Sequence, residues 1–101
     1  LGATAQAGIA ALKLSNPRAR IYWLNALPAW TDAGGGTPVD LGNIRTAIAA
    51  ACTAKGVTCW DSYSTPWIAA ADTSDGTHPT VTPTATCGHR KIATEILARL
   101  P

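Results

Sequence analysis

The apolar run at residues 20–27 restricts the possible folds of this chain more than any other feature of the sequence. It reads Arg-Ile-Tyr-Trp-Leu-Asn-Ala-Leu and lacks the polar alternation of a strand that has one face in water. A nearly unbroken run of this kind is typical of a strand buried on both faces in a parallel sheet, and Pro28 ends it. A second, shorter run at residues 57–60 predicts another strand. Because parallel neighbours need a crossover connection, the two runs predict a right-handed βαβ unit.

Helices are predicted on both sides of these strands. The Ala-rich residues 1–14 suit a helix packed closely on a sheet. The crossover helix is predicted over residues 40–55, with Asp40 as its N-cap and Gly56 as the left-handed residue that ends it. An amphipathic helix is predicted from residue 87 to residue 101. The pattern is that of an α/β protein.

Two irregular stretches, residues 28–39 and 61–86, connect these elements. The first contains three consecutive glycines at positions 34–36 but matches neither phosphate-binding glycine template. The second contains at most a short helical turn at residues 66–71. Connections this long in a compact domain are usually functional, so the second stretch is where a site is expected.

Composition narrows the function classes. At 101 residues the chain has the size of one domain, and it contains no apolar run long enough to cross a bilayer. Its net charge is +2 and its Lys and Arg residues are scattered, which predicts no nucleic-acid partner. Low charge, few lysines and a possible cysteine bridge favour a secreted or extracytoplasmic location.

The three cysteines are an odd number, so at most one bridge can form within the chain. Cys52 and Cys59 lie on either side of a predicted helix end and form a plausible short disulfide, which leaves Cys87 over. Pairing of Cys87 with either of the others stays open. Cys87, His78 and His89 include zinc-ligand types, but their spacing fits no standard zinc pattern, and neither a metal nor a cofactor is predicted.

The segment at residues 75–79, Asp-Gly-Thr-His-Pro, holds a carboxylate and an imidazole at a spacing suited to catalysis. A histidine that acts as a general base needs one ring nitrogen free and the other bonded to an acceptor that fixes its tautomer. Gly76 permits a positive φ and Pro79 disfavours helix at His78, so the segment is predicted to be a turn in which Asp75 folds back on His78.

Taken alone, this segment is also an ordinary turn, since Asp-Gly and His-Pro are common turn dipeptides. Its position favours the catalytic interpretation, because it follows the second strand and ligands of open parallel sheets bind beyond the carboxyl ends of the strands. Trp30 and Trp67 lie in the loops predicted at the same edge. They are candidates either to shield the site or to stack on the substrate.

The order of elements, together with the Asp75 to Pro79 block and the Gly-His-Arg-Lys-Ile-Ala sequence at residues 88–93, resembles the C-terminal half of the SGNH (GDSL-type) hydrolases. The resemblance covers nearly the whole chain. It implies a three-layer αβα, flavodoxin-like fold, of which this chain supplies the last two parallel strands and three helices. It also implies that residues 1–101 are the C-terminal half of a single domain.

The activity implied by the resemblance is that of a serine esterase acting on a small ester, with His78 as general base and Asp75 orienting it. The nucleophilic serine and the oxyanion hole of that family belong to the N-terminal half, which is therefore the expected partner. The serines of this chain all lack the glycine-flanked turn that exposes a nucleophile. They are Ser15, Ser62, Ser64 and Ser74. The alternative is a non-catalytic binding or structural module that keeps the fold.

Overall fold

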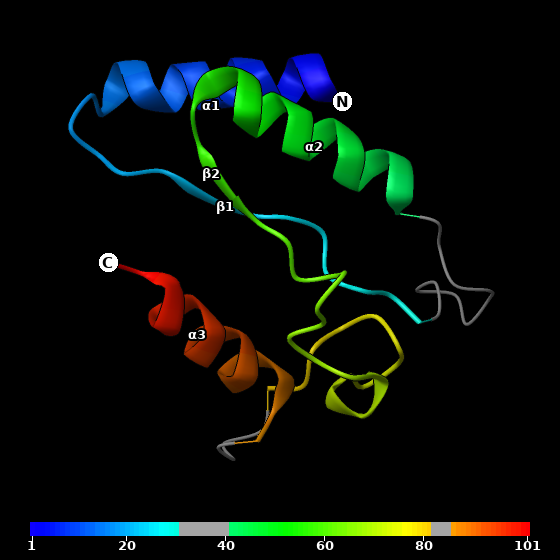
Figure 1. Ribbon diagram of the computed structural model, residues 1–101. Helices are drawn as coiled ribbons and strands as arrows, with labels where there is room; N and C mark the ends of the chain where they lie inside the picture. The colour runs from blue at the N-terminus through cyan, green and yellow to red at the C-terminus, as the bar shows by residue number, and fades with distance from the viewer. Residues whose placement is uncertain (31–40, 82–85) are drawn as a thin grey trace. The chain divides into compact units, whose positions relative to one another are not determined.

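A computed structural model describes residues 1–30, 41–81 and 86–101 of the chain. These residues form three α-helices and a two-stranded parallel sheet, as an α/β pattern predicts (Figure 1). In chain order the elements are α1 (Gly2–Ser15), β1 (Tyr22–Leu24), α2 (Gly42–Lys55), β2 (Thr58–Trp60), the short 3₁₀ helix η1 (Ala70–Asp72) and α3 (Gly88–Arg99).

The chain divides into two compact units. The described part of the first comprises residues 1–26 and 41–62 and contains α1, α2 and the sheet. The described part of the second comprises residues 27–30, 63–81 and 86–101 and contains η1 and α3. None of the helices in the described part of the chain combines the length and the apolar character that crossing a bilayer requires.

In the first unit, α1 and α2 pack against each other on one face of the sheet (Figure 1). The core between helices and strands contains Ile9, Ile48, Cys52 and Val57. Ile9 is completely buried, and the core excludes water from the helix–sheet contact. Burial of these apolar side chains is the main favourable contribution to folding of this unit.

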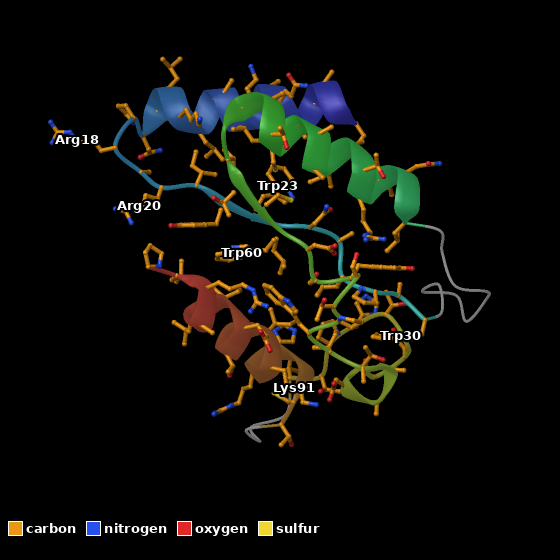
Figure 2. The ribbon with its side chains drawn as sticks, viewed as in Figure 1. Arg18, Arg20, Trp23, Trp30, Trp60 and Lys91 are labelled. Atoms are coloured by element: carbon orange, nitrogen blue, oxygen red, sulfur yellow. The ribbon has the colours of Figure 1, made fainter. Side chains whose placement is uncertain are left out.

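The two faces of the sheet differ because side chains alternate along each strand. Trp23 pairs with Cys59 in the register, and both pack against the helices. Tyr22 and Trp60 lie on the other face, where their rings stack with centroids 5.0 Å apart; Figure 2 labels Trp60 and, from β1, Trp23. The interplanar angle of 20° corresponds to stacked aromatic rings, which add to the pairing of the strands.

The end of α2 follows the prediction from sequence. Gly56 adopts φ 63°, a left-handed conformation, and its amide donates to the carbonyl oxygens of Cys52 and Thr53. A side chain at this position would be strained, and glycine avoids that cost. The predicted N-cap, Asp40, lies outside the described residues; the helix begins at Gly42 after Leu41.

Both strands are shorter than predicted. β1 covers Tyr22–Leu24 within the apolar run at residues 20–27. The amide of the next residue, Asn25, still donates to the Trp60 carbonyl oxygen (3.0 Å), while the Asn25 side chain bonds elsewhere. Its Oδ1 accepts a hydrogen bond from the Ala26 amide (2.8 Å), and its Nδ2 donates to the Arg45 carbonyl (3.0 Å). The predicted turn at residues 66–71 is also displaced, since the structure has the 3₁₀ helix at Ala70–Asp72.

In the second unit, the described helices are η1 and α3. Trp67 is buried, and the guanidinium of Arg99 from the last turn of α3 lies 4.4 Å from its ring centroid. An ion pair between Lys91 and Asp72 joins α3 to η1, with Nζ 2.6 Å from Oδ1. The side-chain contacts of α3 with Trp67 and η1 therefore include one cation–π contact and one ion pair.

We predict that Ile9→Ala lowers the free energy of unfolding by about 2–5 kcal/mol, because it removes a fully buried side chain and leaves a cavity. Urea unfolding followed by far-UV circular dichroism measures the change. Leu14→Ala on the same helix is the matched control, because Leu14 is 85% exposed; its effect should stay within about 0.5 kcal/mol. Equal effects of the two substitutions would contradict the described core.

Candidate active site

The loop that connects η1 to the segment before α3 carries the candidate catalytic pair. It is called the His78 loop here and comprises residues 73–79. An isolated antiparallel bridge between Thr73 and Pro79 closes the loop, and the Ser74 amide donates to the His78 carbonyl oxygen (2.9 Å). These contacts fix the separation of the loop ends, so the side chains within it project from a defined backbone.

Gly76 forms the turn of the His78 loop. Its φ is 84°, which a residue with a side chain rarely adopts, and the sequence predicted such a conformation here. Its amide donates to Oγ1 of Thr73 (2.9 Å) and its carbonyl accepts from the Trp30 amide (2.8 Å). The turn is therefore bonded on both sides.

The carboxylate of Asp75 accepts three hydrogen bonds within this loop. Oδ1 accepts from the backbone amides of Thr77 (2.9 Å) and His78 (2.7 Å). Oδ2 lies 2.5 Å from Nδ1 of the His78 ring. The structure thus brings together the two side chains that the sequence predicted to pair.

These three donors lower the pKa of Asp75 to about 2, with the backbone amide of His78 the largest cause and its ring the second. Above that range Asp75 is a carboxylate and can only accept, so Nδ1 of the ring must carry the hydrogen. In the neutral ring the lone pair then resides on Nε2, which is the arrangement a general base requires.

The ring of His78 is accessible. Its side chain is 65% exposed, and Nε2 forms no hydrogen bond with any described residue. Ser74 lies in the same loop, but its Oγ contacts the His78 carbonyl oxygen (3.4 Å). Ser62 is completely buried in the first unit, where Oγ donates to the Asn25 carbonyl (3.3 Å). Neither Ser62 nor Ser74 therefore donates its hydroxyl to Nε2 of His78.

The two loop tryptophans predicted to contact substrate differ in exposure. Trp30 is partly exposed and touches the His78 loop through its backbone amide. Trp67 is 6% exposed, and Arg99 covers one face of its ring. A substrate-binding role for either residue stays a prediction.

The predicted disulfide between Cys52 and Cys59 is not formed in the structure, where all three cysteines are thiols. Cys52 is buried in the apolar core of the first unit and packs there as a small apolar side chain. Burial, together with a hydrogen bond to Cys52, raises the pKa of Cys59 to about 11. Cys87 is buried at the N-cap of α3.

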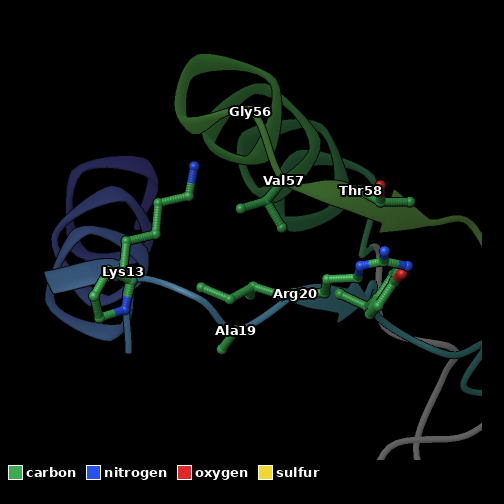
Figure 3. Close-up of a pocket in the computed structure, with 9 residues that line it drawn as sticks. Lys13, Ala19, Arg20, Gly56, Val57 and Thr58 are labelled. Carbon is green, nitrogen blue, oxygen red and sulfur yellow. The ribbon is translucent and has the colours of Figure 1, made fainter. Parts of the chain in front are cut away.

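Two clefts lie within the first unit. The larger, about 540 Å³, lies at the amino ends of the strands, where Lys13 and Arg20 are its charged lining residues (Figure 3). Lys13 Nζ donates to the Lys55 carbonyl oxygen at the end of α2. That bond neutralises partial negative charge at a helix C-terminus, which is the ordinary role of a lysine in this position.

The smaller cleft, about 310 Å³, lies at the carboxyl ends of the strands, the edge at which open parallel sheets bind ligands. Its polar lining includes Asn25, Arg45 and Asp61, and the Arg45 and Asp61 side chains are 3.6 Å apart. The sequence gave no sign of the pairing between Arg45 and Asp61, because the two residues come from separate elements.

Sequence reasoning also missed Asp72 and Lys91. Asp72 is a single acid in an otherwise apolar and small-residue stretch at positions 68–72, which is the signal that could have marked it as a buried, paired carboxylate. Nothing local identified Lys91 as its partner, because the two residues are 19 positions apart.

Within the described residues, no group of three or more His, Cys, Asp or Glu side chains is placed to hold a metal ion. Protein-family models, curated proteins and solved structures were each compared with this chain, and none of the three comparisons gives a match. The interpretation of the site therefore depends on the geometry of its own residues.

We predict that the Asp75 carboxyl titrates near pH 2, well below its ordinary value of 3.8. Because the folded-state pKa is lowered, the stabilisation of the loop by this carboxylate is complete above about pH 3.8 and is lost as the pH falls toward 2. A ¹³C-carboxyl NMR titration measures the midpoint.

The variant His78→Ala separates the causes of this shift. Its midpoint should move only part of the way back toward 3.8, because the backbone amides of residues 77 and 78 still donate to Asp75. A midpoint near 3.8 in the unmodified chain would show that the described hydrogen bonds do not persist in solution.

Proposed function

We propose that this chain is the base-bearing part of a serine esterase of the SGNH (GDSL) type. In this proposal His78 accepts the proton of a serine hydroxyl through Nε2, and Asp75 holds the ring by Nδ1. The observation that carries the proposal is the 2.5 Å contact between Nδ1 and Oδ2, combined with a ring that is 65% exposed. A hydrogen-bonded Asp–His pair with an accessible Nε2 is what acyl transfer by a serine needs from its base.

The nucleophilic serine and the oxyanion hole come, in this proposal, from another segment of the same protein or from a second chain. The fold would then be completed as a three-layer αβα, flavodoxin-like domain in which β1 and β2 are the last two parallel strands. A two-stranded sheet is small for an α/β domain, and further strands would cover its edges. The substrate would be a small ester, and the extracytoplasmic location expected from composition remains a prediction.

The reaction would proceed by attack of the serine oxygen on the ester carbonyl carbon, while its proton moves to Nε2 of His78. The imidazolium that forms is stabilised by the Asp75 carboxylate, which stays ionised. The proton then passes from Nε2 to the departing alcohol, which leaves an acyl-enzyme. Water then attacks the acyl carbon by the same steps, with His78 accepting the proton of water and returning it to the serine oxygen. The base lowers the barrier only where a hydroxyl is positioned beside Nε2. Hydrogen-bond donors to the developing oxyanion supply most of the remaining stabilisation of the transition state.

We predict that the 101-residue chain alone hydrolyses p-nitrophenyl acetate no faster than an equal concentration of free imidazole. A fluorophosphonate probe should leave its mass unchanged, because the chain has a base without an activated serine. Hydrolysis well above the imidazole rate, abolished by that probe, would refute the assignment of the nucleophile to another segment.

In the protein that carries both parts, His78→Ala should lower kcat by about 10⁴-fold or more, since the corresponding groups of a serine triad contribute on that order. Asp75→Asn should lower it less, because Oδ1 of the asparagine still accepts from the two loop amides that shape the turn. Steady-state kinetics with p-nitrophenyl acetate measures both. An unchanged rate in His78→Ala would leave the non-catalytic module as the better interpretation.

A further inference from the structure

The two ends of the His78 loop converge on the backbone of Asp72. Asp72 directly precedes the loop, and Thr80 directly follows it. The Asp72 carbonyl oxygen accepts hydrogen bonds from both the amide (2.8 Å) and Oγ1 (3.1 Å) of Thr80. A single carbonyl group therefore joins the two residues that flank the loop, in addition to the bridge between Thr73 and Pro79.

The first turn of α3 attaches to the same point. The amide of Gly88 donates to Oγ1 of Thr80 (2.9 Å), and the amide of His89 donates to the Thr80 carbonyl (3.1 Å). Gly88 is so close that a Cβ atom placed on it would lie 2.4 Å from the Asp72 carbonyl oxygen and 3.0 Å from Cβ of Pro79. Only glycine permits this approach of the helix to the base of the loop.

The side chain of Asp72 adds a charged link between η1 and α3. It is 9% exposed, and its two oxygens have different partners. Oδ2 accepts from the Ala69 amide (2.8 Å), within its own turn, and Oδ1 accepts from Lys91 Nζ on α3 (2.6 Å). The Ala69 amide first and the lysine second hold the pKa of Asp72 below its usual value, so the buried group is a carboxylate.

We propose that Lys91 is a positioning residue for the Asp75–His78 pair, and that it acts by holding Asp72, and with it the base of the His78 loop, against α3. Lys91 lies on α3 (Figure 2), and its ammonium group contacts the Asp72 carboxylate rather than donating a described hydrogen bond to Asp75 or His78. Without the ammonium group, the buried carboxylate of Asp72 keeps one donor and must draw in water, which displaces it from α3. The loop then loses its fixed base, and the contact between Nδ1 and Oδ2 becomes intermittent.

The expected loss of activity on removal of Lys91 rests on the proposed function. The expected loosening of the contact between His78 Nδ1 and Asp75 Oδ2 does not. A lysine that only stabilised the second unit would shift its unfolding midpoint and leave the folded loop unchanged. A positioning residue must also change the loop in molecules that are folded. The hydrogen-bonding of Asp75 reports this directly, since its pKa is lowered by the amides of the loop and by the His78 ring.

The test compares Lys91→Met, Lys91→Arg and the matched control Arg90→Met, whose wild-type side chain is exposed and precedes Lys91 on the same helix. We expect the ¹³C-carboxyl midpoint of Asp75 in Lys91→Met to rise from about 2 toward 3.8. The Nδ1–H proton of His78 should shift upfield and exchange faster with water. Lys91→Arg should restore both signals, because a guanidinium also reaches Oδ1, and Arg90→Met should leave both unchanged.

A second variant covers the case in which Lys91→Met does not fold. Asp72→Asn keeps the shape of the side chain and its acceptor for the Ala69 amide, and removes only the charge that holds Lys91. It should give the same rise in the Asp75 midpoint. A folded Lys91→Met or Asp72→Asn chain with an unchanged Asp75 midpoint and an unchanged Nδ1–H signal would overturn the proposal.

These readouts need no nucleophile, so the two proposals fail separately. A raised Asp75 midpoint in Lys91→Met supports the positioning role even if no complete form of the protein hydrolyses esters, an outcome that would count only against the esterase. In an active complete protein, Lys91→Met should lower kcat several-fold with little change in KM, because the base rather than the substrate contact is displaced. An unchanged kcat in that protein would overturn the positioning role.

Discussion

Four hydrogen bonds to the oxygens of Asp72 determine the arrangement of the second unit. Its carbonyl oxygen accepts two from Thr80, and its carboxylate accepts one from Ala69 and one from Lys91. A buried carboxylate is tolerated only when its charge is paired and its oxygens are bonded, and here Lys91 on α3 and the Ala69 amide before η1 meet both requirements. The constraint joins η1, the His78 loop and α3 at one residue.

The first unit depends on a different kind of force. Its two short strands form few hydrogen bonds, and its stability comes from the apolar side chains between the sheet and the pair α1 and α2. The opposite face carries the stacked rings of Tyr22 and Trp60. In this unit non-directional burial dominates, whereas in the second unit directed polar contacts fix the backbone around a carboxylate.

The features that the sequence predicted correctly depend on residues close together in the chain. The left-handed end of α2 follows from Gly56, and the pairing of Asp75 with His78 follows from a spacing of three residues and a glycine between them. Parallel pairing of the strands followed from the helix that separates them. The lengths of the strands did not, because the apolar run at residues 20–27 carries no mark of where the pairing of β1 (Tyr22–Leu24) ends.

The features that sequence reasoning missed join distant residues. Lys91 and Asp72 meet only because Gly88 lets α3 approach the backbone at the base of the loop. The spacing of Cys52 and Cys59 predicted a bridge, but both are thiols in the structure, where the Cys59 thiol is hydrogen-bonded to Cys52. Tertiary contacts decide such cases, and no periodicity or short motif in the chain encodes them.

The three bonds to Asp75 also restrict how the imidazole can rotate. Turning the ring by a half-circle about its Cβ–Cγ bond would separate Nδ1 from Oδ2, while the other carboxylate oxygen is already engaged by two amides. The lone pair of the neutral ring therefore keeps one direction in space before any alcohol arrives. In the proposed esterase, an incoming hydroxyl would have only its own approach to organise, because the orientational entropy of the base is lost once, during folding, and not again at each turnover.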